Sequence, residues 1–294
     1  MRMRIAVTGR QGQVVQSLIE RARGSDVEII AIGRPDLDLA NPGSIAKAIE
    51  PLRPDIILSV AAYTAVDRAE SEPGLARLVN ADGAGAVAAL AGRLSIPILH
   101  LSTDYIFDGS GDTVWREEDA PGPLGVYGRT KLAGELAVAA ATPNHAIIRT
   151  AWVYGPFGSN FVKTMLRLAA AGKEVGVVDD QHGNPTSSLD IADGLLQIAA
   201  NLVSDPNPRY RGTFHMAGGG DASWADLAEA VFAHSAAHGG PSVPLRRITT
   251  AEFPTAARRP ANSRLDSSKL AAVHGVALPH WREALPPVID RLLH

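Results

Sequence analysis

A tyrosine and a lysine stand four positions apart in the segment Tyr127-Gly-Arg-Thr-Lys131. On a helix these positions lie one turn apart on the same face. A free tyrosine titrates near pH ~10, and a neighbouring ammonium group favours its phenolate form. We therefore expect Lys131 to lower the pKa of Tyr127 and to make it a general acid for the alkoxide that forms from a ketone. Lys131 is also long enough to reach the ribose of a cofactor.

Hydroxyl side chains end a predicted strand upstream of this pair, in Leu101-Ser-Thr-Asp-Tyr-Ile-Phe107. Side chains at the carboxyl end of a parallel strand point into the crevice where ligands bind. Ser102 or Thr103 could then donate a hydrogen bond to the carbonyl oxygen that Tyr127 protonates. A Tyr-x-x-x-Lys pair alone is common on helix surfaces, so the order of these features along the chain is what predicts a site.

A glycine turn, Thr8-Gly-Arg-Gln-Gly-Gln-Val-Val15, follows the first predicted strand. Glycines let a backbone approach a pyrophosphate, and the next helix offers free N–H groups. Gly9 and Gly12 are present, but Val15 stands where a third glycine is usual. The alternative is a tight turn without a ligand. The position after the first strand favours a dinucleotide cofactor.

The choice of cofactor depends on the end of the second strand, where Gly33-Arg34 follows Ile32. An acidic residue there would bind the ribose 2′-hydroxyl of NAD, whereas an arginine can pair with the 2′-phosphate of NADP. We predict NADPH as cofactor through Arg34, with NADH as the alternative. Arg34 could also be a solvated loop cation, and Asp36 and Asp38 could contact the adenosine ribose.

These residues need a parallel sheet to position them. Short apolar runs read as buried strands, and stretches with apolar residues at helical spacing alternate with them. The strands are expected at 4–8, 28–32, 55–59, 96–101 and 146–150, and the helices at 13–23, 44–52, 74–94 and 127–141. The alternation predicts an α/β fold with a Rossmann-type, doubly wound parallel sheet.

The pattern loosens after Tyr154, where helices are expected at 160–171, 190–202 and 224–238. We predict that residues 1–154 mainly bind NAD(P). Residues 155–294 are predicted to form mainly a smaller substrate-binding lobe, with some return of the chain to the Rossmann sheet.

Composition excludes several classes of function. The chain has 294 residues, a net charge of -3 and no cysteine, which rules out disulfides, thiolate catalysis and cysteine zinc sites. The charge does not favour nucleic acid or an anionic membrane, and we predict neither as a partner. We see no signal peptide and no membrane span, and we expect a cytoplasmic protein. We predict no metal site. Nothing in the sequence supports a homodimer, which stays open.

Seven segments together resemble the extended short-chain dehydrogenase/reductases, and among them the dTDP-4-dehydrorhamnose reductase family. They cover nearly the whole chain, and 65–73 and 180–186 are more specific than any general dehydrogenase motif. The segments are 61–73, 102–107, 126–135, 149–154, 160–165, 180–186 and 259–265.

The resemblance implies reduction of the C4 ketone of dTDP-4-dehydro-β-L-rhamnose to dTDP-β-L-rhamnose. It implies Tyr127 as proton donor, Lys131 as its partner and Thr103 as the hydroxyl that polarises the carbonyl. Thr103 and Asp104 would line the sugar, and Trp152 would pack against the substrate. Further residues would contact the cofactor: Gly12, Gln13, Val14, Asp38, Leu39, Ala61, Ala62 and Tyr63.

Two points stay open beside this resemblance. The guanidinium groups of Arg258 and Arg259 suit a pyrophosphate, and we take Arg259 as a substrate contact, but an exposed loop pair is an equal alternative. Some relatives bind magnesium through glutamates where this chain has Ser17 and Leu189, so no metal is carried over.

Two other functions are compatible with the pattern. One is a nucleotide-sugar epimerase or 4,6-dehydratase with bound NAD, although Tyr105 stands where a dehydratase would place a second carboxylate. The other is a non-catalytic regulatory subunit that resembles the reductase. The complete set of Thr103, Tyr127 and Lys131 argues against the second.

Overall fold

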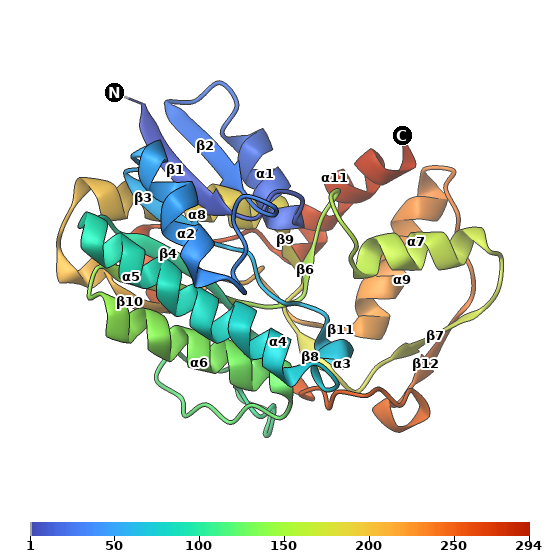
Figure 1. Ribbon diagram of the computed structural model, residues 1–294. Coiled ribbons are helices and arrows are strands. Elements are labelled where there is room, and N and C mark those ends of the chain that lie inside the picture. The colour runs from blue at the N-terminus through green and yellow to red at the C-terminus, as the bar shows by residue number, and fades with distance from the viewer. Residues whose placement is uncertain (1) are drawn as a thin grey trace.

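A six-stranded parallel sheet forms the centre of the larger part of the molecule in the computed structural model, which describes residues 2–294 (Figure 1). The strand order is β10-β5-β4-β3-β1-β2, and all neighbouring pairs are parallel. The strands are β1 Met3–Thr8, β2 Val27–Ile32, β3 Ile56–Ser59, β4 Ile98–Thr103, β5 His145–Thr150 and β10 Gly212–His215. The predicted doubly wound Rossmann-type sheet is confirmed.

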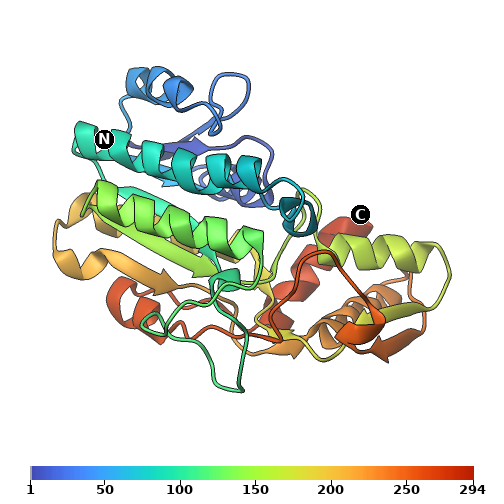
Figure 2. The same cartoon turned by 60° about the horizontal axis from the view of Figure 1, so that its bottom comes forward.

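Helices cover both faces of this sheet, which explains why its strands are predominantly apolar. One face packs against α2 (Pro42–Ile49), α5 (Ala84–Leu94) and α6 (Val126–Ala141), and the layer of α5 and α6 is clear in Figure 2. The other face packs against α1 (Gln13–Arg21), α8 (Ser188–Ser204) and α10 (Ser268–His274). Neighbouring strand residues alternate between the two cores, as Ala6 and Val7 do.

A separate core lies beside the carboxyl end of the sheet, in the part of the molecule on the right of Figure 1. It is built mainly from α7 (Phe161–Ala170), α9 (Trp224–Ala237) and α11 (Trp281–Leu293). Three small sheets accompany this lobe. They are β7 (Val175–Val178) with β12 (Leu245–Ile248), β6 (Val153–Tyr154) with β9 (Thr186–Ser187), and β8 (His182–Gly183) between β11 (Ala222–Ser223) and β13 (Asn262–Ser263).

The chain crosses between these parts more than once. After the lobe helix α7 it returns to the sheet, where α8 packs on α1 and β10 pairs with β5. Two short helices, α3 (Val66–Ala69) and α4 (Pro73–Arg77), lead through a π-helical turn at 78–83 into α5. Within residues 2–294, no helix is long and apolar enough to cross a membrane.

Candidate active site

A cavity of about 720 Å³ lies at the carboxyl ends of β1, β3 and β4, where the strand order reverses between β1 and β3. Such a reversal is where open α/β sheets bind their ligands. The cavity brings together most of the predicted residues. These are Gly9, Gly12, Gln13, Val14, Ala61, Ala62, Thr103, Asp104, Tyr127, Lys131 and Trp152.

The glycine turn joins β1 to α1 at one end of this cavity. Gly9 has a φ of 102°, a conformation that favours glycine, and Gly12 precedes the first helical residue. The hydroxyl oxygen of Thr8 accepts the N–H groups of Val60 and Ala61, each at 3.0 Å, so the ends of β1 and β3 are held side by side. The exposed amino end of a nine-residue helix in a ligand-sized cavity fits a dinucleotide pyrophosphate.

Two arginines meet beyond this turn, and sequence analysis found only one of them. Arg34 is exposed, which fits both the predicted contact with a 2′-phosphate and the alternative of a solvated loop cation. Arg10, within the glycine turn, lies against Gly33, bonds to the carbonyl of Arg34 at 3.4 Å and pairs with Asp36 at 2.5 Å. A Cβ at Gly33 would be 3.4 Å from Cγ of Arg10, so the two residues lie side by side. The signal was present in the sequence, since Arg10 is the residue after Gly9.

Four predicted binding residues lie outside the cavity lining besides Arg34. Leu39 is buried in the core and contacts Gly83, and the Asp38 carboxylate accepts the N–H of Ala40. The Tyr63 hydroxyl donates to Glu72 at 2.7 Å. Arg259 is the fourth. The structure therefore gives Leu39 and Tyr63 structural contacts of their own.

Helix α6 carries Tyr127 and Lys131 on its first two turns. Its amino end is capped from outside: Glu70, just after α3, accepts the N–H of Val126 at 2.7 Å. Gly128 allows the helix to lie on the loop after β4, because a Cβ there would be 2.2 Å from the carbonyl oxygen of Tyr105. The segment 65–73 thus helps to position the catalytic helix, a role that its local sequence does not reveal.

The pKa of Tyr127 differs from the sequence-based prediction. Burial raises it to about 12, against a hydrogen bond from Thr103 that lowers it. The prediction that Lys131 lowers this pKa is therefore wrong for this structure, because desolvation of the phenolate dominates. A tyrosine with this pKa is fully protonated at neutral pH and can act as a proton donor.

Lys131 is held beneath the cavity by contacts to β4. Its Nζ donates to the carbonyl oxygen of Leu101 at 2.7 Å and lies 3.5 Å from Nε2 of His100. Burial lowers the pKa of Lys131 to about 8, and the charge of Glu135 one turn along α6 opposes that change. Glu135 itself forms a buried ion pair with Arg149 of β5. Sequence analysis missed His100 because its contact with Lys131 joins residues 31 positions apart.

The strand-end hydroxyls take different roles. Thr103 donates to Oδ1 of Asp104 at 2.8 Å and lies close enough to Tyr127 to hydrogen-bond with it. Burial raises the pKa of Asp104 to about 6, despite hydrogen bonds from Ser263 and Thr103. Oδ2 of Asp104 and Oγ of Ser102 are buried and have no hydrogen-bond partner within residues 2–294. Oδ2 of Asp104, when ionised, can therefore accept a hydrogen bond from a polar ligand, and Oγ of Ser102 can donate or accept one.

Trp152 forms the wall of the cavity toward the lobe. Its ring stacks on that of Trp224, with centroids 3.5 Å apart and planes at 5°. Its φ of 47° is in the left-handed region, which is strained for a bulky residue and typical of functional sites. Gly183 faces the indole, and a Cβ there would be 2.5 Å from it. Trp152 is therefore fixed from both sides.

Arg259 pairs with Asp67 at 3.0 Å, and the other carboxylate oxygen of Asp67 accepts the N–H of Ala257. This ties the loop before β13 to helix α3. Nε of Arg259 is buried and lacks a partner within the described chain. The pairing brings the segments 61–73 and 259–265 into contact.

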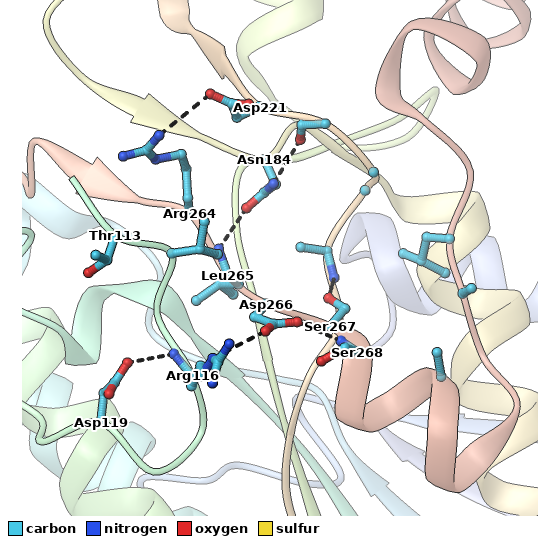
Figure 3. Close-up of a pocket in the computed structure, with 18 of the residues that line it drawn as sticks. Thr113, Arg116, Asp119, Asn184, Asp221, Arg264, Leu265, Asp266, Ser267 and Ser268 are labelled. Atoms are coloured by element: carbon cyan, nitrogen blue, oxygen red, sulfur yellow. Dashed lines mark hydrogen bonds and ion pairs between the residues drawn. The ribbon is translucent and has the colours of Figure 1, made fainter.

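A second cavity, of about 1000 Å³, lies apart from the predicted residues (Figure 3). Both arginines in its lining have acidic partners: Arg264 is 3.8 Å from Asp221, and Arg116 is 3.4 Å from Asp266. The amide of Asn184 bridges the N–H of Leu265 and the carbonyl of Gly220. These contacts fasten the loop before α6 to the carboxyl-terminal segment.

The search of the sequence for metal-ligating residues requires one correction. The histidines at 234 and 238 form a His-x-x-x-His pair that the sequence analysis overlooked. At the positions considered for magnesium, the Ser17 hydroxyl lies 2.9 Å from that of Ser188, so Ser188 rather than Leu189 faces Ser17. No carboxylate takes part in that contact.

A Rossmann-type sheet with a glycine turn, a strand-end threonine and a Tyr/Lys pair at one cavity defines a short-chain dehydrogenase/reductase, an NAD(P)-dependent oxidoreductase. The family model for the RmlD substrate binding domain matches residues 3–294. The chain therefore belongs to the RmlD family.

Similar proteins agree with this assignment. A dTDP-4-dehydrorhamnose reductase of Sinorhizobium fredii (strain NBRC 101917 / NGR234) is 50% identical over 99% of this chain and 98% of its own. Among solved structures, that of a dTDP-4-dehydrorhamnose reductase from Clostridium acetobutylicum has a TM-score of 0.92, 37% identity and coverage of 99% and 100%. Another, from Bacillus anthracis in complex with NADP, has a TM-score of 0.91, 33% identity and coverage of 99% of both chains.

Proposed function

We propose that this protein reduces the C4 ketone of dTDP-4-dehydro-β-L-rhamnose to dTDP-β-L-rhamnose with NADPH as reductant. The observation that carries the proposal is the convergence of Thr103, Tyr127 and Lys131 on one cavity with the glycine turn. The likeness to reductases of this name over nearly the full chain supports the substrate, and the relative with bound NADP supports the cofactor.

The side chains divide the work at the ketone. The reduced nicotinamide, when bound, supplies hydride to C4. Tyr127, protonated at neutral pH, donates its proton to the carbonyl oxygen as negative charge develops there. Thr103 hydrogen-bonds that oxygen from the strand end. Lys131, as an ammonium group beneath the cavity, would hold the cofactor ribose.

Binding roles follow from the same geometry. The turn around Gly9 and Gly12 holds the pyrophosphate of the cofactor, and Arg10 and Arg34 pair with its 2′-phosphate. We propose that Asp104 bonds a sugar hydroxyl through its unpartnered Oδ2 and that Trp152 packs against the sugar nucleotide. Arg259, freed in part from Asp67, would pair with the substrate pyrophosphate.

We further propose that residues 1–154 mainly bind the dinucleotide and residues 155–294 mainly the sugar nucleotide. A cytoplasmic place of action is part of the proposal, and cell fractionation tests it.

The deciding experiment is turnover of NADPH with dTDP-4-dehydrorhamnose, followed by identification of the sugar product. The proposal expects stoichiometric NADPH oxidation and dTDP-rhamnose. An epimerase or dehydratase would instead retain tightly bound NAD without net oxidation. A regulatory subunit would bind the ligands without turnover. Either result would replace the proposed reaction.

A further inference from the structure

Three side chains with metal-binding atoms meet on the lobe, away from both cavities. His234 and His238 lie on the last turn and at the C-cap of α9, and Asp290 lies on the neighbouring helix α11. One ligand atom from each lies within 4.8 Å of the others, and Nε2 of His234 is 2.7 Å from Oδ1 of Asp290. None of the three lines the candidate active site, so the reductase reaction does not account for them.

A local hydrogen bond fixes the tautomer of His238 in a way that suits a cation. Nδ1 of His238 lies 2.9 Å from the carbonyl oxygen of His234 and can only donate to it, which leaves the lone pair on Nε2. A backbone carbonyl that fixes the tautomer in this way is typical of metal-binding histidines. Nε2 of His234 lies 2.7 Å from Oδ1 of Asp290, so an imidazole nitrogen and a carboxylate oxygen already face one another.

The two helices are held in place without any ion. Val231 and Phe232 of α9 and Val288 and Ile289 of α11 belong to the same buried core. The side chains that meet above this core are thus brought together by packing rather than by a ligand. Because both helices are already in place, an ion would require only the side chains to adjust.

We propose that His234, His238 and Asp290 form a binding site for a divalent transition-metal ion, of which Zn²⁺ is the representative, linking α9 to α11. Two imidazoles and one carboxylate are a ligand set that Zn²⁺ takes in a tetrahedral site, with water in the fourth position. The ion would replace the proton between Nε2 of His234 and Asp290, and those two atoms would move apart to accommodate it.

The competing explanation is an ordinary hydrogen-bonded pair of His234 and Asp290. That pair needs no contribution from His238, whereas a metal site does. His238→Asn is therefore the discriminating variant, and Asp290→Asn removes the carboxylate ligand. Glu283→Gln is the matched control, because Glu283 is an exposed carboxylate on the same helix α11 that does not belong to the cluster.

The experiment titrates ZnCl₂ into the full chain, without an affinity tag and freed of metal by chelation, and follows heat and Tm. We expect one Zn²⁺ per chain and a rise in Tm of roughly 5 °C at about 100 times Kd. His238→Asn and Asp290→Asn should weaken binding at least about tenfold, and Glu283→Gln should not. Circular dichroism checks that each variant is folded.

Two results would overturn the proposal. One is the lack of saturable Zn²⁺ binding by the unmodified chain. The other is binding that His238→Asn and Asp290→Asn leave unchanged, because the ion would then be held elsewhere. Weaker binding in His238→Asn and Asp290→Asn, with binding unchanged in Glu283→Gln, supports the site.

Discussion

Nε2 of His100 lies 3.5 Å from Nζ of Lys131, and Nδ1 of the same ring lies 3.1 Å from Oγ of Ser59. Burial and the charge of Lys131 hold the pKa of His100 well below its usual value, so the ring is neutral. A neutral ring that donates to Ser59 through Nδ1 can accept from the ammonium group through Nε2. His100 is thus a positioning residue for Lys131.

This contact predicts a change in the pH profile. Lys131 has a pKa of about 8 and acts as an ammonium group, so kcat/KM should fall as pH rises through about 8. The charge of Glu135 raises the pKa of Lys131, and the charge of His145 lowers the pKa of His100. His100→Leu removes an acceptor and should move the alkaline limb to lower pH, whereas His100→Gln should partly restore it. An unmoved limb in His100→Leu would show that His100 is only structural.

The raised pKa of Asp104 predicts that replacing this carboxylate stabilises the protein at neutral pH. Its pKa rises from 3.8 to about 6 on folding, because its carboxylate is desolvated. A group with a raised folded pKa contributes stability below pH ~3.8 that is lost as pH rises through about 6. Asp104→Asn should therefore raise the free energy of unfolding at pH 7 by up to about 3 kcal/mol. Denaturant unfolding of both proteins at pH 4 and pH 7 measures this, and an equal difference at both pH values would refute it.

The close approach of Gly183 to Trp152 predicts a selective effect on the substrate. A Cβ at Gly183 would be 2.5 Å from the indole, so Gly183→Ala must displace Trp152. We expect a KM for the sugar nucleotide raised by about tenfold or more, with the Kd of NADPH unchanged. Gly74→Ala is a control at an exposed position of α4, where φ is not positive and no atom lies near the added methyl group. Equal loss of NADPH binding would contradict the placement of Trp152 on the sugar side.

The pair Arg10 and Arg34 predicts the choice of cofactor. Each should contribute roughly 1.5–3 kcal/mol to binding of NADPH but not NADH, the scale of a charge-assisted hydrogen bond. Arg10→Ala and Arg34→Ala are compared by titration with both cofactors, beside the exposed Arg23→Ala as control. If both cofactors lost affinity equally, these arginines would not be reading the 2′-phosphate.

Residues that act through local spacing could be predicted from the sequence. The five amino-terminal strands were found because strands covered on both faces are continuously apolar, and the Tyr127/Lys131 pair because its helical spacing is visible in the chain. β10 was not assigned, since four residues after a polar loop carry too little pattern. Helix α11 was missed because Pro286 and Pro287 lie inside it, where proline normally ends a helix.

The remaining features depend on the tertiary structure. Glu70 caps α6 from a distance of 56 residues, and no local motif marks that role. The burial that raises the pKa of Tyr127 is likewise a property of the folded cavity, which is why spacing alone predicted the opposite direction. Arg10 and the histidine pair at 234 and 238, by contrast, were readable in the sequence and were overlooked.

The most direct test of the account is the kcat of Tyr127→Phe for NADPH oxidation with dTDP-4-dehydrorhamnose. This change keeps the ring and its edge-on contact with Tyr105 and removes only the proton-donating hydroxyl. We expect kcat to fall roughly 10²–10⁴-fold, with the Kd of NADPH nearly unchanged. Thr103→Val should lower kcat by a smaller factor, because Thr103 contributes a hydrogen bond but not the proton. Turnover of Tyr127→Phe at close to the wild-type rate would contradict the assignment of the proton donor and of the active site built around it.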